Sequence, residues 1–160
     1  MLEKKGKEIE SQMLNTINNY KRSLAEKKAQ LDRAEKAVKE AKGFGDLSEN
    51  TEYVNARNLA SRLIVEIITL QDTIDTYDKY AAKYTPTGKV QIGSVVKLLD
   101  VGLDTVRYVK VYPPGLGNAK IGALAANSPV GIAILGKSSG TTIEVQAPIG
   151  TLLYSIQEVL

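Results

Sequence analysis

Residues 13–41 read MLNTINNYKRSLAEKKAQLDRAEKAVKEA and residues 53–81 read YVNARNLASRLIVEIITLQDTIDTYDKYA; these two stretches decide the fold. Both place side chains that are almost all apolar at alternating intervals of three and four residues, which is the heptad pattern of a coiled coil. In the first stretch the heptad positions are Met13, Ile17, Tyr20, Leu24, Lys27, Leu31, Ala34, Val38 and Ala41. In the second they are Tyr53, Ala56, Ala60, Leu63, Ile67, Leu70, Ile74, Tyr77 and Ala81. We therefore predict two long helices that pack along one apolar seam.

The two sets of heptad positions share one pivot. When they are paired in antiparallel order, beginning with Ala41 and Tyr53, the two residue numbers of every pair add up to 94. This predicts an antiparallel coiled-coil hairpin with Leu47 at its apex and arms that are roughly 60 Å long. Lys27 is the one charged seam residue, and we expect it either to fix the register or to extend its ammonium group out of the seam.

The composition changes near residue 85. Residues 3–84 contain no proline and only three of the thirteen glycines, whereas all five prolines and the other ten glycines follow. We therefore predict an α+β protein with two domains, the coiled-coil hairpin at 1–84 and a small β-rich domain at 85–160.

The second domain has the composition of strands separated by turns. Strands are expected at 95–101, 105–111, 141–145 and 152–159. A short helix is expected to begin with Ser128 as N-cap and Pro129 in its first turn, and to end at Gly136.

The composition also excludes several kinds of site. The chain has no cysteine and no histidine, so it can form neither disulfides nor thiolate or imidazole metal sites. Any metal would be bound by oxygen, which suits Mg²⁺ or Mn²⁺. Its apolar runs are too short to cross a bilayer, and the charged N-terminus lacks the apolar core of a signal peptide. We therefore expect a cytoplasmic protein with no membrane contact.

Positive charge is concentrated in residues 21–42, which hold eight basic and four acidic side chains, although the whole chain carries only +3. One interpretation is a solvated helix face with ion pairs between residues four apart. The other is a stripe that lies beside a phosphate backbone.

The expected apex, residues 43–53, reads GFGDLSENTEY. Either Asp46 or Ser48 could cap the second helix. Asp46 and Glu49 are three residues apart, so both carboxylates can face the same way. They could simply favour the helix N-terminus, or they could offer oxygen ligands that complete the coordination of a Mg²⁺ held by a partner.

Residues 40–53, with Ala56-Arg57 after them, resemble the tip signature of the Gre family of bacterial transcript-cleavage factors. Residues 127–137 resemble the C-terminal signature of that family, and the last expected strand lies where the family has its own. The resemblance extends over nearly the whole chain and implies an FKBP-like fold for residues 85–160.

Gre factors insert their hairpin into the secondary channel of bacterial RNA polymerase and are not enzymes themselves. Their tip carboxylates help the polymerase to hold a second Mg²⁺ and to activate water, and the polymerase then cuts the 3′ end of backtracked nascent RNA, which releases arrested complexes. The resemblance implies that Asp46 and Glu49 are the catalytic carboxylates. It also implies a monomer that binds Mg²⁺ only jointly with the polymerase.

The resemblance assigns two further sets of residues. Those that shape the tip or face the RNA are Ser48, Asn50, Tyr53 and Arg57. Those that dock on the rim of the channel are Ser128 and Pro129.

Three other functions remain open at this point. A Gre-like regulator or inhibitor could occupy the channel without promoting cleavage, although the intact Asp46 and Glu49 argue against it. A peptidyl-prolyl isomerase would need an aromatic pocket, and residues 85–160 have three tyrosines but no Phe or Trp. A plain coiled-coil adaptor would not explain so specific a tip.

Overall fold

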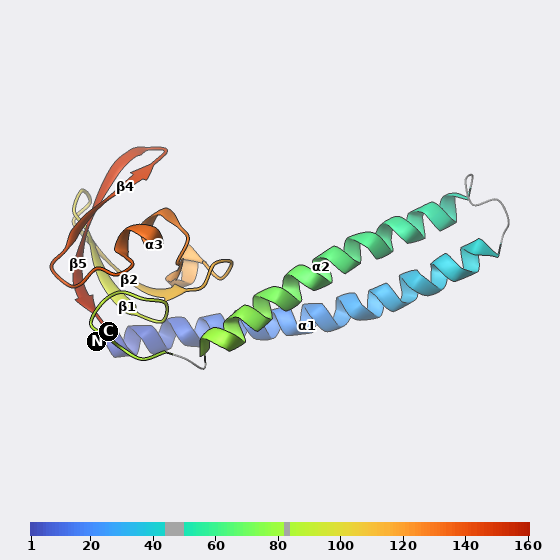
Figure 1. Ribbon diagram of the computed structural model, residues 1–160, viewed down its shortest axis with the longest axis horizontal. Coiled ribbons are helices and arrows are strands. Elements are labelled where there is room, and N and C mark those ends of the chain that lie inside the picture. The colour runs from blue at the N-terminus through green and yellow to red at the C-terminus, as the bar shows by residue number, and fades with distance from the viewer. Residues whose placement is uncertain (44–49, 82–83) are drawn as a thin grey trace. The chain divides into compact units, whose positions relative to one another are not determined.

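The computed structural model describes residues 1–43, 50–81 and 84–160. The chain forms two compact units, which are described in turn: residues 17–75, and residues 1–16 together with 76–160. Helices α1 (Leu2–Lys42) and α2 (Thr51–Ala81) contribute to both units (Figure 1).

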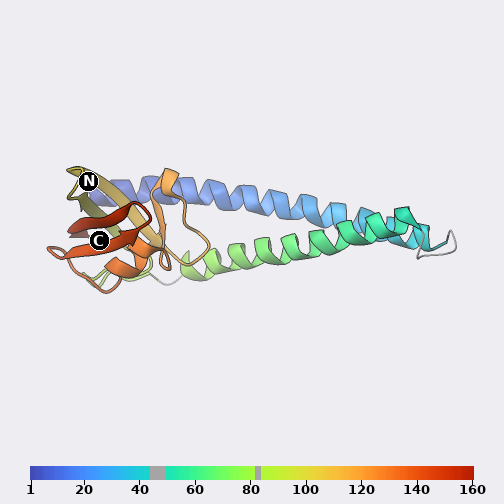
Figure 2. The ribbon, with the colours of Figure 1, turned by 90° about the horizontal axis from the view of Figure 1, so that it is seen from above.

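The unit of residues 17–75 is a pair of antiparallel helices. Leu31 and Ala34 of α1 pack with Ala60 and Leu63 of α2, so residues late in the first helix contact residues early in the second. Both views show the two helices running side by side here (Figures 1 and 2). The predicted hairpin is therefore confirmed, with Leu31 against Leu63 as the pairing requires.

Burial follows the predicted heptads. Every heptad position is buried or half-buried except Ala81, and the Leu63 side chain is only 1% exposed. One of the two expectations for Lys27 is met: its ammonium group extends out of the seam. There its Nζ lies 2.9 Å from Oε2 of Glu66. The expected apex, Leu47, lies outside the described residues; α1 ends and α2 begins on either side of it.

The other unit contains a five-stranded sheet with the order β3-β2-β1-β5-β4. The strands are β1 (Val95–Asp100), β2 (Thr105–Tyr112), β3 (Ala123–Ala125), β4 (Thr142–Ala147) and β5 (Gly150–Val159). β3 pairs with β2 in parallel, and the other neighbours are antiparallel. Four of the five strands lie where the sequence predicted them. β3 was missed, because its three residues include no β-branched side chain and it depends on a distant partner.

The core of this unit lies between the curled sheet and the short helix α3 (Pro129–Ile134) (Figure 1). Ile134 of α3 is fully buried with Val96, Val111 and Ile156 of three different strands. A short 3₁₀ helix (Ala119–Ile121) precedes β3. Long N-terminal helices followed by a small mixed sheet confirm the predicted α+β class.

The first part of α1, up to Thr16, belongs to the same unit as the sheet. Gly6 lies so close to β1 that an added Cβ would be 2.5 Å from Cγ2 of Val95, so glycine permits this approach. One turn later, the Glu10 carboxylate accepts hydrogen bonds of 2.5 Å from the hydroxyls of both Tyr77 and Tyr112. Its Oε2 also lies 3.1 Å from Nζ of Lys110. Glu10 therefore joins the start of α1 to the end of α2 and to β2.

Electrostatics keep this cluster in one protonation state. Burial acts to raise the pKa of Glu10, but the hydrogen bonds from Tyr112 and Tyr77 and the charge of Lys110 outweigh it and lower that pKa. Burial and the neighbouring Glu10 carboxylate raise the pKa of both tyrosines above the ordinary value. The carboxylate stays ionised and the hydroxyls stay protonated, which is the combination that the hydrogen bonds need.

Candidate functional site

Asn50 joins the two helix ends that flank the predicted tip. Its Oδ1 accepts a hydrogen bond of 3.1 Å from the backbone N–H of Tyr53, which makes it the N-cap of α2. Its Nδ2 donates one of 2.8 Å to the carbonyl of Ala41, in the last turn of α1. One side chain therefore caps the second helix and ties it to the first.

The expectation that Asp46 or Ser48 caps α2 is wrong. Helix α2 begins at Thr51, so Asn50 holds the N-cap position, and its amide supplies both the acceptor for the first turn of α2 and the donor for Ala41. An ionised Asp could only accept. Three of the predicted tip residues, Asp46, Ser48 and Glu49, lie outside the described residues, so their roles remain expectations. By sequence they fall in the segment that Asn50 closes.

The two other predicted tip residues differ in their surroundings. Tyr53 is half-buried at the first heptad position of α2, so it supports the helix pair next to the tip. Arg57, one turn further along, is exposed and makes no ion pair with any described residue. Its guanidinium is therefore available to an anionic partner.

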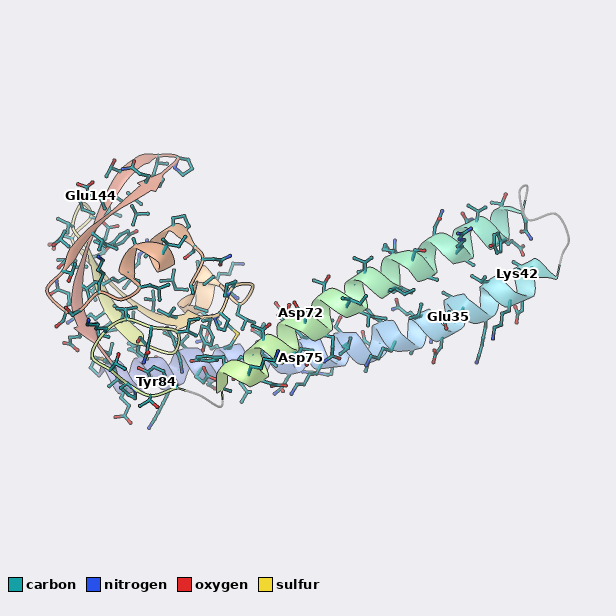
Figure 3. All side chains as sticks on the ribbon, in the orientation of Figure 1. Glu35, Lys42, Asp72, Asp75, Tyr84 and Glu144 are labelled. Carbon is teal, nitrogen blue, oxygen red and sulfur yellow. The ribbon has the colours of Figure 1, made fainter. Side chains whose placement is uncertain are left out.

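The basic face of α1 is largely unpaired. Within residues 21–42, Lys27 is the one basic residue whose ion pair with another described residue is within 4 Å. Six basic side chains are exposed and make no such contact in the described parts of the chain: Lys21, Lys28, Arg33, Lys36, Lys39 and Lys42. Figure 3 shows Lys42 in the last turn of α1 (Figure 3). The face is solvated, as one interpretation expected, but the ion pairs four residues apart that it also expected are not seen among the described residues. Pairing with described residues therefore does not occupy these six cations.

Ser128 and Pro129 begin α3 as predicted. The Ser128 hydroxyl accepts a hydrogen bond of 3.1 Å from the Gly131 N–H and donates one of 2.7 Å to the carbonyl of Ala125. Gly131 is needed here, because a Cβ would lie 2.2 Å from that carbonyl oxygen. The hydroxyl is thus used within the fold, and the exposed groups are Pro129 and Ile132, the latter 64% exposed. Sequence reasoning missed Ile132, since exposure of a single apolar residue leaves no pattern.

No group of three acidic side chains among residues 1–43, 50–81 and 84–160 could hold a metal ion. None of the helices in these ranges is both long and apolar enough to span a membrane.

Two family models match almost the whole chain. The one described as "Transcription elongation factor, N-terminal" matches residues 2–78, and the one described as "Transcription elongation factor, GreA/GreB, C-term" matches residues 85–160. The chain belongs to the GreA/GreB family. The resemblance that the tip and C-terminal signatures suggested is therefore confirmed.

Curated relatives agree with this assignment. The transcription elongation factor GreA of Bartonella tribocorum is 33% identical over 123 residues, which are 77% of this chain and 78% of the relative. GreA of Novosphingobium aromaticivorans is 32% identical over 143 residues, 88% of this chain and 90% of the relative. Both relatives are named as transcription elongation factors.

Solved structures show weaker likeness. The crystal structure of GreA factor homolog 1 (Gfh1) of Thermus thermophilus has a TM-score of 0.40 and 21% identity, covering 90% of this chain and 94% of that one. A GreA/GreB factor from Nitrosomonas europaea has a TM-score of 0.40 and 24% identity, covering 51% of this chain and 77% of that one. Both TM-scores are low, so they add nothing to the family assignment.

Proposed function

We propose that this GreA/GreB member inserts its hairpin into the secondary channel of bacterial RNA polymerase and stimulates cleavage of the 3′ end of backtracked nascent RNA. The observation that carries the proposal is the closure of the helix ends by Asn50, which bonds to both Ala41 and Tyr53. By sequence, Asp46 and Glu49 fall between the two helix ends that Asn50 joins. Family membership supplies the biological setting.

In this account the tip supplies ligands and the polymerase supplies the rest of the site. Asp46 and Glu49 would share a Mg²⁺ ion with the polymerase, and the bound ion would make its water a better nucleophile and offset charge on the scissile phosphate. Carboxylate oxygens suit Mg²⁺, and the chain has no histidine or cysteine that would favour another metal. Two carboxylates alone do not fill its coordination shell, so the protein should bind Mg²⁺ weakly on its own.

The unpaired cations of α1 and the guanidinium of Arg57 would face phosphates of the nascent RNA. Their lack of ion pairs with described residues means that no internal pair has to break before they bind an anion. Pro129 and Ile132 would contribute to docking on the rim of the channel. Substituting any of these residues should therefore lower the affinity for the elongation complex and leave the rate of the cleavage step itself unchanged.

The test is cleavage of a labelled transcript in elongation complexes stalled in a backtracked state. Wild-type protein should speed cleavage when polymerase is present and should leave free RNA intact. Tight binding to polymerase without faster cleavage would identify a channel-blocking regulator instead. Cutting of free RNA would make the chain a nuclease, and absence of polymerase binding would refute the proposal altogether.

A further inference from the structure

Part of the outer edge of β2 is open. β3 pairs with Lys110, Val111 and Tyr112 only, so the first half of β2 has no neighbour on that side among the described strands. β4, at the other edge of the sheet, also has no outer neighbour among the described strands, but the edge of β2 lines a cavity.

The hydrogen-bond pattern identifies the groups that this edge presents. The N–H of Lys110 donates outward, to the carbonyl of Gly122, at 2.9 Å. Because backbone direction alternates along a strand, the N–H and C=O groups of Tyr108 and Val106 also point outward, away from β1. Neither residue makes a backbone bond outside the β1–β2 ladder within the described chain. The carbonyl of Tyr108 is covered by Gly122, where an added Cβ would lie 2.9 Å from it, so the N–H of Tyr108 and both backbone groups of Val106 form the unused template for another strand.

A cavity of about 600 Å³ lies along this edge. Its lining includes Arg107, Tyr108 and Val109 in succession, and successive residues of a strand face opposite sides of the sheet. The cavity therefore extends over both faces of the open edge. That is the space that the alternating side chains of an added strand would occupy.

On the face of the sheet that carries Arg107, the cavity is apolar apart from two polar groups, the Arg107 guanidinium and the Tyr154 hydroxyl. Val109, Leu124 and Val130 line it together with Tyr154, which is only 6% exposed. The Tyr154 hydroxyl makes no hydrogen bond to the described residues, and no fully buried side-chain oxygen or nitrogen in the described chain lacks a partner. The hydroxyl must therefore reach solvent, and the cavity that it lines provides the route.

The charge at the rim is positive. Arg107 is exposed and has no ion pair with any described residue. On the other face, Nζ of Lys5 lies 5.5 Å from the centroid of the Tyr108 ring and forms an ion pair of 3.7 Å with Oε2 of Glu8. An incoming strand would thus meet an apolar hollow and, two residues along on the same face, a free guanidinium.

We propose that the open edge of β2 binds an extended peptide segment of a partner protein by strand addition. Both backbone groups of Val106 and the N–H of Tyr108 pair with the peptide backbone. An apolar side chain enters the hollow beside Tyr154, and an acidic side chain two positions away meets Arg107. The recognised pattern is apolar-x-acidic, in either order along the peptide.

To test this proposal, a random peptide library displayed on phage is selected for binding to the full chain. Selected peptides should share the alternating apolar and acidic pattern, and their binding should shift the amide NMR signals of Val106 and Tyr108. Selection against the Arg107→Glu variant should favour a basic residue in place of the acidic one. Failure to enrich any peptide, or an unchanged charge preference with Arg107→Glu, would overturn the proposal.

A second variant tests the backbone bonds separately. Val106→Pro removes an outward N–H that the β1–β2 ladder does not use, so the sheet should survive. It should weaken a selected peptide about tenfold, the size of one lost interfacial hydrogen bond. Val106→Ala keeps the N–H and should bind nearly as wild type does. Equal binding by Val106→Pro, with its sheet shown intact by circular dichroism, would exclude strand addition at this edge.

Discussion

Replacing Glu10 with Gln should destabilise the unit formed by the sheet and the start of α1. In the wild type, the carboxylate accepts from Tyr77 and Tyr112 and pairs with Lys110. The Tyr112 side chain is fully buried, so its hydroxyl cannot exchange this partner for water. A Gln amide has one acceptor oxygen in place of two, so its N–H₂ group must face either Tyr77 or the pair Tyr112 and Lys110, all of which donate in the wild type.

The magnitude follows from the partners. Charge-assisted hydrogen bonds contribute about 1.5–3 kcal/mol each and neutral ones about 0.5–1.5 kcal/mol. The Glu10 side chain is 30% exposed, so water compensates part of the change. We expect the free energy of unfolding to fall by about 2 kcal/mol. Urea unfolding followed by tyrosine fluorescence measures it.

Glu8→Gln is the matched control. Glu8 lies on the same helix, with 48% side-chain exposure and a long ion pair of 3.7 Å to Lys5. Its replacement should change the free energy of unfolding by less than about 0.5 kcal/mol. If Glu10→Gln were as stable as this control, the cluster would not stabilise the unit and the reasoning would be refuted.

The same variant has a pH signature. The pKa of Glu10 in the folded protein is below its ordinary value of 4.5. Its contribution is therefore present in full above the pKa of the unfolded chain, and is lost as the pH falls through the folded pKa. The difference between wild type and Glu10→Gln should be constant near neutral pH and shrink below pH 4.5. A difference that grew on acidification would contradict the assigned ionisation.

Three further variants test the fold around the site. Leu63→Ala should lower the free energy of unfolding by about 2–4 kcal/mol, because the Leu63 side chain is 1% exposed. Replacing the exposed Leu59 with Ala should lower it by less than about 1 kcal/mol, and chemical denaturation measures both values. Asn50→Ala should cost about 1 kcal/mol and speed amide exchange in the first turn of α2, while unchanged exchange would mean that another residue caps the helix. Gly6→Ala should destabilise by about 1–3 kcal/mol, since its Cβ would meet Val95, and wild-type stability would show that the helix can move away.

The sequence predicted the helix pair well because its information is local and repeated. Each heptad position constrains the next, and the shared pivot fixes which residue of one helix meets which of the other, as Leu31 against Leu63 shows. Caps at the start of α3 were equally accessible, since Ser128 and Pro129 are a local signal. At the start of α2, the sequence suggested Asp46 or Ser48 as the cap, whereas the cap is Asn50, and its second bond, to Ala41, depends on the neighbouring helix.

Features that depend on distant partners could not be predicted. Glu10 looks like any other surface carboxylate of a helix, and its partner Tyr112 is 102 residues away along the chain. The parallel strand β3 exists because β2 lies beside it. The open edge of β2 is a consequence of where β3 begins, which only the assembled sheet reveals.

The most direct test of the proposed function is the rate of transcript cleavage in backtracked complexes with Asp46→Ala, Glu49→Ala and the exposed control Glu40→Ala, measured across a Mg²⁺ titration. Each tip variant should bind polymerase as wild type does and lose at least about tenfold in cleavage rate, with partial recovery as Mg²⁺ rises, because a lost ligand mainly lowers occupancy of the ion. Glu40→Ala should behave as wild type. Wild-type cleavage by either tip variant would contradict the account.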